Sequence, residues 1–221
     1  MAQVVGNWGG GNIWCITSDE FSSNSYYCDV KAEGGVLIDS GLDGEAIDEV
    51  LSLHGFRPRW VFCTHGHFDH IGGASHFQRK YGSQVFLHKA DERTMKASNF
   101  LLMAIKIPHK VRLPEVTYVQ NDFTYNIASH NLRYLPAPGH TPGSCIIEFG
   151  NAWFTGDTIY SRGVGLSSMP GEDHKLISES ILGHWDGVKE GCLICPGHGP
   201  VADGGIVRRE NLPLLKFLGI N

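Results

Sequence analysis

The chain has 221 residues, of which 42% are hydrophobic and 19% charged, a composition typical of a globular protein with a sizeable buried core. Its formal net charge of −5 leaves no basic footprint, so a nucleic acid is excluded as an expected partner. No apolar run approaches the roughly 20 residues that span a bilayer, and we expect no signal peptide because the amino terminus lacks its basic and apolar regions.

Strands and helices are expected to alternate along the chain. Short strands are predicted at residues 13–17, 25–30 and 36–39, followed by a helix at 44–54 and a buried strand at 60–63. A helix at 74–81 and a strand at 84–88 precede an apolar helical segment at 94–107. Strands return at 132–135, 144–149 and 152–154, before a helix at 174–184 capped by Glu172 or Asp173, a strand at 193–195 and a closing helix at 210–218.

No linker, repeat or low-complexity tract divides these elements, which fall into two comparable halves. We therefore expect one domain over residues 1–221. Helices on the outside of two stacked sheets would satisfy the pattern, because each sheet must bury an apolar face. The expected fold class is α/β, with four layers in the order αββα.

Six cysteines are scattered along the chain, several of them within apolar runs. Cys192 and Cys195 have the spacing of a redox motif, but residues three apart on a strand point to opposite faces of the sheet. We expect buried, reduced thiols rather than disulfides, and with them a cytoplasmic location.

The sharpest chemical pattern is the segment 64–70, Thr-His-Gly-His-Phe-Asp-His, which leaves an apolar strand and enters a helix. His65 and His67 alternate along the chain and can point at one position, while the turn into the helix brings Asp69 and His70 to a second. Imidazole and carboxylate ligands suit zinc, iron or manganese, and the absence of cysteine argues against a purely structural zinc site.

Three later segments carry further candidate ligands, each beside a predicted strand and flanked by glycine or proline. They are His140 in Pro-Gly-His-Thr-Pro-Gly, Asp157 in Thr-Gly-Asp-Thr and His198 in Pro-Gly-His-Gly-Pro. All could project from one edge of the sheets, as in active sites built from loops on a rigid scaffold.

The order His-x-His-x-Asp-His, His, Asp, His resembles the metallo-β-lactamase superfamily, and particularly its glyoxalase II-like hydrolases. Similar blocks extend over nearly the whole chain, at 24–26, 39–41, 140–144, 156–158, 170–171, 197–200 and 210–215. The resemblance implies the αββα fold and two metal ions. It assigns one metal to His65, His67 and His140, the second to Asp69, His70 and His198, and a bridging role to Asp157.

The resemblance also implies that Asp39 orients a ligand or a metal-bound water from behind, although the sequence alone equally allows a turn former at a strand end. Two dications with Asp69, Asp157 and a hydroxide leave about one positive charge, which would stabilise the oxyanion formed at a carbonyl. We therefore expect metal-bound hydroxide to attack a small ester-type carbonyl, with a thioester preferred and with Asp69 and Asp39 in catalytic roles.

The substrate contacts of glyoxalase II enzymes are only partly matched. Their additional helical domain is not expected in the few residues after His198, and Leu166 and Ser168 stand roughly where their ligand contacts would be. Residues 162–165, Arg-Gly-Val-Gly, match half of a stretch found in persulfide dioxygenases, which use a single iron. A mononuclear iron oxidoreductase and a non-catalytic metal-containing regulatory protein therefore remain alternatives.

Two apolar features have open roles. Residues 100–107 could form a wall or lid for a hydrophobic acyl thioester, a homodimer surface, or a helix packed on a sheet. Trp8, beside three glycines, could fold over the site or form a mobile hairpin tip. The expected partner is a small-molecule substrate, with no nucleic acid and no membrane span.

Overall fold

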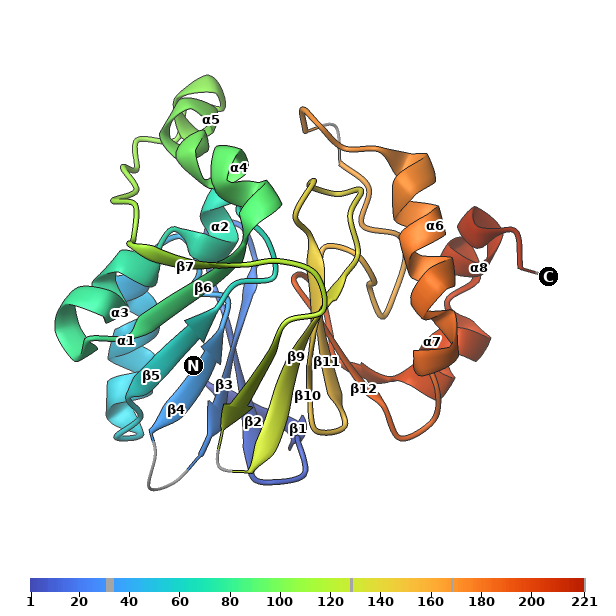
Figure 1. The fold of residues 1–221 in the computed structure, drawn as a ribbon, viewed down its shortest axis with the longest axis horizontal. Helices are drawn as coiled ribbons and strands as arrows, with labels where there is room; N and C mark the ends of the chain where they lie inside the picture. Colours follow the sequence, from blue (N-terminus) through green and yellow to red (C-terminus); the bar gives the residue numbers. More distant parts are fainter. Residues whose placement is uncertain (31–33, 128, 168, 221) are drawn as a thin grey trace.

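A computed structural model describes residues 1–30, 34–127, 129–167 and 169–220. Two β-sheets lie face to face, and helices cover the outer face of each (Figure 1). The α/β class and the αββα layer order expected from the sequence are therefore confirmed. Among the described residues, no helix has the length and apolar character needed to cross a bilayer.

The first sheet has seven strands in the order β1-β2-β3-β4-β5-β6-β7. Pairing is antiparallel as far as β4 and parallel from β4 to β7. The apolar faces of two helices, α1 (Gly44–Leu53) and α3 (Ala74–Tyr81), pack on its outer face. The strands are β1 Gln3–Asn7, β2 Asn12–Thr17, β3 Asn24–Asp29, β4 Gly35–Ile38, β5 Pro58–Phe62, β6 Gln84–His88 and β7 Val116–Val119.

The second sheet has six strands in the order β13-β12-β11-β10-β9-β8, and only β11 and β12 pair in parallel. Its outer face is covered by α6 (His174–His184), α7 (Gly204–Glu210) and α8 (Leu212–Leu218) (Figure 1). Asp173, one of the two expected caps, is the N-cap of α6. The strands are β8 Thr124–Ile127, β9 His130–Pro136, β10 Cys145–Phe149, β11 Ala152–Gly156, β12 Leu193–Pro196 and β13 Ala202–Asp203.

An aromatic core fills the space between the sheets. Phe62 and Phe86 of the first sheet stack with ring centroids 4.6 Å apart, and Tyr134 of the second sheet packs on them. The cysteines are free thiols, as expected. Cys195 points into this core and Cys192 into the outer layer, so the opposite-face prediction for this pair is confirmed.

The apolar segment expected as one helix at 94–107 forms two short helices, α4 (Glu92–Lys96) and α5 (Ser98–Ala104). The expectation of a helix packed on a sheet is wrong, because α5 contacts α2 (Phe68–Ile71) and α4 instead. Within residues 100–107 only Leu102 is buried, whereas Phe100 and Met103 are 64% and 67% exposed. The apolar sequence of this segment therefore predicted more burial than the structure shows.

Trp8 neither covers the expected ligands nor forms a mobile tip. It is 1% exposed and stacks on Phe149 with ring centroids 4.1 Å apart. Its carbonyl oxygen accepts a hydrogen bond from Asn151, at the start of β11, whereas Asp157 follows the other end of that strand. Trp8 therefore closes the end of the sandwich that is remote from the expected ligands.

We expect Trp8→Ala to lower the free energy of unfolding by about 3–5 kcal/mol, because it empties a packed aromatic position in the core. Guanidinium denaturation followed by circular dichroism would measure the loss. Bound metal, counted per folded chain, should be the same as in the wild type. A variant with unchanged stability but altered metal content would contradict this placement.

Candidate metal centre

The structure brings the seven expected ligands together at one end of the two sheets. Within the described residues they form three overlapping groups, in each of which the candidate ligand atoms lie within 4.8 Å of one another. Their role as metal ligands stays a prediction. They are His65, His67, Asp69 and His70 after β5, His140 after β9, Asp157 after β11 and His198 after β12.

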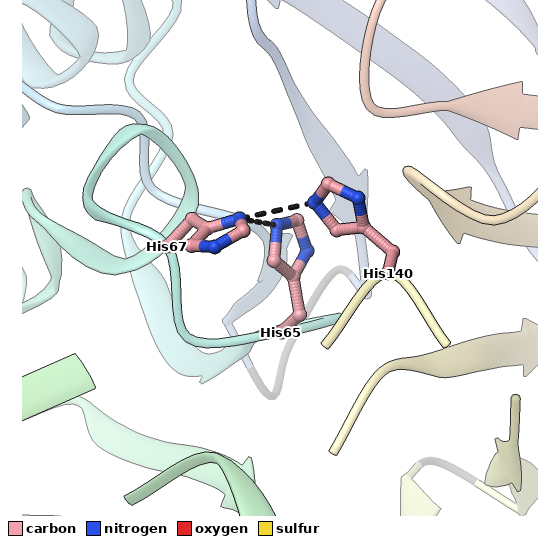
Figure 2. Close-up of side chains that lie close together, drawn as sticks. All are labelled: His65, His67 and His140. Atoms are coloured by element: carbon pink, nitrogen blue, oxygen red, sulfur yellow. Dashed lines mark hydrogen bonds between the residues drawn. The ribbon is translucent and has the colours of Figure 1, made fainter. Parts of the chain in front are cut away.

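The first group consists of His65, His67 and His140, which come from different sheets (Figure 2). The Nδ1 atom of His67 lies 3.1 Å from Nε2 of His65 and 3.0 Å from Nε2 of His140. All three side chains are buried. Three ring nitrogens therefore converge in a space from which water is largely excluded.

The hydrogen bonds made by Nδ1 of His65 and of His140 determine whether the Nε2 atom of each ring carries a proton or a lone pair. Nδ1 of His140 donates to the carboxylate of Glu172, which can only accept when ionised. Nδ1 of His65 lies 3.1 Å from the hydroxyl oxygen of Thr64, whose proton is already donated to Asp39. When these two rings are neutral, each therefore turns a bare Nε2 lone pair toward Nδ1 of His67. One shared proton cannot satisfy both lone pairs, whereas a cation can.

The second group joins Asp69, His70 and His198, and Asp157 lies between the two groups. Nε2 of His198 is 3.4 Å from a carboxylate oxygen of Asp69 and 3.5 Å from one of Asp157. Nε2 of His70 and Oδ1 of Asp157 are both buried without a hydrogen-bond partner, and they lie 3.5 Å apart. Buried polar atoms without a partner are costly, and a divalent cation would satisfy both.

Burial and charge divide the histidines into two kinds. Burial lowers the pKa of His67 to about 4 and that of His65 well below its ordinary value, so both are neutral at pH 7. Burial acts in the same direction on His70 and His198, but the carboxylates of Asp69 and Asp157 outweigh it and raise these pKa values to about 9 and about 10. The metal-free second group is therefore held together by protons on its histidines.

Asp39 combines the two roles that the sequence left open. It ends β4 in the left-handed conformation, with φ of 55°, and so turns the chain. Its carboxylate also accepts from Nδ1 of His70 at 2.8 Å and from the backbone and hydroxyl of Thr64. These contacts place Asp39 behind the candidate ligands, where it orients His70.

Asp91, which sequence reasoning missed, connects two ligand-bearing loops. It lies in a single 3₁₀ turn, η2 (Lys89–Asp91), and is fully buried. Its carboxylate accepts from the backbone nitrogen of Gly66 at 2.6 Å, from that of Gly143 at 2.7 Å and from the hydroxyl of Thr141 at 2.7 Å. Nothing around Asp91 in the sequence marks it, because its partners are distant along the chain.

Glycine is required where the ligand loops touch one another. A Cβ atom on Gly66 would lie 2.9 Å from the carbonyl oxygen of Asp91. A Cβ atom on Gly197 would lie 2.2 Å from Oδ1 of Asp157, inside the centre itself. Of the two residues expected at the substrate contacts, Leu166 is 39% exposed and Ser168 lies outside the described residues.

Comparison with known proteins gives a family and several relatives. The family model of the metallo-beta-lactamase superfamily matches residues 18–202. A hydroxyacylglutathione hydrolase of Anaeromyxobacter dehalogenans is 33% identical over 78% of this chain, which spans 60% of that relative's length. The hydroxyacylglutathione hydrolase GloC of Haemophilus influenzae is 24% identical over 90% of this chain and 96% of its own length. The solved structure of TTHA1623 in a di-iron-bound form is 26% identical, covers 90% of this chain and 98% of that one, and superposes with a TM-score of 0.79.

We expect Asp91→Ala to weaken both the fold and metal retention. It leaves the backbone nitrogens of Gly66 and Gly143 buried without acceptors, at a cost of about 1–3 kcal/mol each. Chemical denaturation and metal analysis of the purified variant would measure both effects. Asp122→Ala, at an exposed position, is the control, and an Asp91 variant that matched this control would contradict the connecting role.

The metal-free chain should lose stability as the pH rises through the alkaline range. The pKa values of His70 and His198 are raised above the ordinary 6.5, so their contribution is complete below pH 6.5 and is lost as the pH passes about 9 and about 10. Metal ions would replace these protons, so the metal-loaded chain should not show the same loss. Thermal unfolding of chelated and zinc-loaded samples across this range measures the difference, and parallel curves would contradict it.

Proposed function

Because the chain belongs to the metallo-beta-lactamase superfamily, we propose that it is a dinuclear metal-dependent hydrolase whose substrate is a small thioester. The observation that carries the proposal is the convergence of bare imidazole nitrogens from His65 and His140 on His67, beside a second group joined to it by Asp157. These side chains fit divalent cations because they offer only imidazole nitrogens and carboxylate oxygens. Zinc is the proposed metal, with iron and manganese as alternatives.

Each proposed ligand set corresponds to one geometric group. His65, His67 and His140 would hold one cation, Asp69, His70 and His198 would hold the second, and the two oxygens of Asp157 would serve both. A bound pair of dications would lower the pKa of a water molecule and polarise a substrate carbonyl. The residues around them are largely buried, which strengthens these electrostatic effects.

The protein's own contribution to the reaction is to orient water and substrate. In thioester hydrolysis the water oxygen bonds to the carbonyl carbon, the carbon–sulfur bond breaks, and a proton passes to the sulfur. Burial would raise the pKa of Asp69, but the neighbouring charge of His70 lowers it overall, so this carboxylate is ionised at neutral pH. Asp69 can therefore accept a hydrogen bond from the attacking water, and Asp39 acts through His70.

Apolar side chains beside the ligands support an acyl group as part of the substrate. Phe68 stands between His67 and Asp69 in the chain and packs with Leu42, Leu102 and Val111. Partly buried side chains extend this cluster, namely Phe21, Leu101, Ile107 and Met169. The names of two relatives, both hydroxyacylglutathione hydrolases, add support for a thioester. We propose a short hydrophobic or hydroxylated acyl thioester.

The test is turnover by the purified chain loaded with zinc, iron or manganese. We expect it to hydrolyse hydroxyacyl-glutathione or short acyl thioesters faster than lactones or a β-lactam, and to contain about two metal ions per chain. Asp157→Ala should lose bound metal and reduce turnover to background, because it removes the oxygen atoms shared by both groups. Asp186→Ala, at a fully exposed position, is the matched control and should retain both.

Other outcomes would support a different function. One iron per chain with oxygen uptake on a persulfide would replace the hydrolase by a mononuclear oxidoreductase. Two bound metals without turnover across the whole panel would favour a regulatory protein. Full turnover by Asp157→Ala would discard the proposed centre.

A further inference from the structure

Glu172 is a buried carboxylate that belongs to neither ligand group. Its side chain is 2% exposed, although it lies in the segment just before α6. It accepts hydrogen bonds from Nδ1 of His140 at 3.0 Å, from the backbone nitrogen of Ser167 at 2.7 Å and from Nε2 of His174 at 2.8 Å. The hydroxyl of Ser167 donates a fourth. A carboxylate this well satisfied has one defined orientation.

Glu172 makes the same kind of contact with His140 as Asp39 makes with His70. Each carboxylate accepts from Nδ1 of a buried histidine whose Nε2 points into the centre. Asp39 serves the group of Asp69, His70 and His198, whereas Glu172 serves the group of three histidines. A histidine that binds a metal through Nε2 keeps one ring proton, on Nδ1, and the carboxylate that accepts this proton leaves Nε2 free as a ligand.

We propose that Glu172 is the positioning residue of the three-histidine site, where it fixes the ring orientation and the tautomer of His140. The inference rests on the proposed metal centre and adds a residue that acts on one of its two sites only. Ser167 completes the arrangement, because it donates twice to Glu172 and so keeps the carboxylate turned toward His140.

The segment around Glu172 has other attachments, so its substitution should not unfold the chain. The backbone nitrogen of Asp173 donates to the carbonyl oxygen of Gly139 at 2.8 Å, and the hydroxyl of Ser180 donates to that of Pro138 at 2.6 Å. These bonds join α6 to the His140 loop independently of the Glu172 side chain. A change in metal binding can therefore be separated from a loss of fold.

The experiment measures Zn²⁺ affinity of the metal-free chain by competition with a chromophoric chelator. Glu172→Gln is expected to weaken one of two equivalents by roughly 10–100-fold, the range found when a ligand's hydrogen-bond partner is removed. Combining Glu172→Gln with a second substitution, in either of two double variants, identifies which metal site is affected. With His198→Ala, which disables the other group, Glu172→Gln should weaken the zinc that remains, whereas with His67→Ala it should have no effect on it.

Controls separate positioning from general structure. Glu179→Gln makes the same change on the exposed face of α6 and should bind zinc as the wild type does. His174→Ala removes only the bond on the solvent side of Glu172 and should have a much smaller effect than Glu172→Gln. Ser167→Ala should be intermediate. The thermal midpoint of each metal-free variant is recorded to verify that it is folded.

Equal weakening by Glu172→Gln in both backgrounds, or no weakening in either, would overturn the inference. Both results leave the proposed function intact if the wild type binds two zinc ions and turns over its substrate. A wild-type chain that bound no zinc would instead overturn the proposed function, and the inference with it.

Discussion

The structure depends on one constraint, which is that side chains with similar charge and similar lone pairs must be held against one another in a buried space. His65, His67 and His140 approach within about hydrogen-bond distance through nitrogens that cannot all be satisfied by protons. Such an arrangement does not form by mutual attraction. It is imposed from behind by buried carboxylates that accept hydrogen bonds from a candidate ligand or from its loop. They are Asp39, Asp91 and Glu172.

The two-sheet scaffold explains why these carboxylates come from such distant places. Both sheets contribute strand ends to the same edge, so every ligand loop begins from backbone that is already fixed by its ladder. Tyr134 strengthens the junction, because its buried hydroxyl lies within hydrogen-bond distance of the carbonyl oxygens of Cys63 and Phe86 across the sheets. The rigid elements thus bring the loops together, and Asp39 and Glu172 then orient the rings of His70 and His140.

The sequence predicted the features that depend on neighbouring residues. Spacing at helical or strand period placed α1, α3, α6 and most strands within a few residues. The histidine segment at 64–70 predicted residues that the structure brings together with His140, Asp157 and His198. The sequence could not predict the roles of Asp91 and Glu172, because the partners that join them to the candidate ligand loops lie 25 to 52 and 32 residues away. Trp8 was misjudged for a related reason. Its glycine neighbours suggest mobility, but Phe149 and His130 enclose it from other hairpins.

The apolar segment of α4 and α5 is a part of the structure where side chains can be changed at little cost in stability. Leu102 anchors α5 next to Phe68, beside the ligands, while Phe100 and Met103 on the same helix stay exposed. The cost of changing exposed residues is small, because no strand ladder or buried carboxylate depends on them. The ligand loops have no such freedom, since a single Cβ at Gly197 would touch Asp157. Physical constraint is therefore greatest at the candidate metal centre and least at the apolar surface nearby.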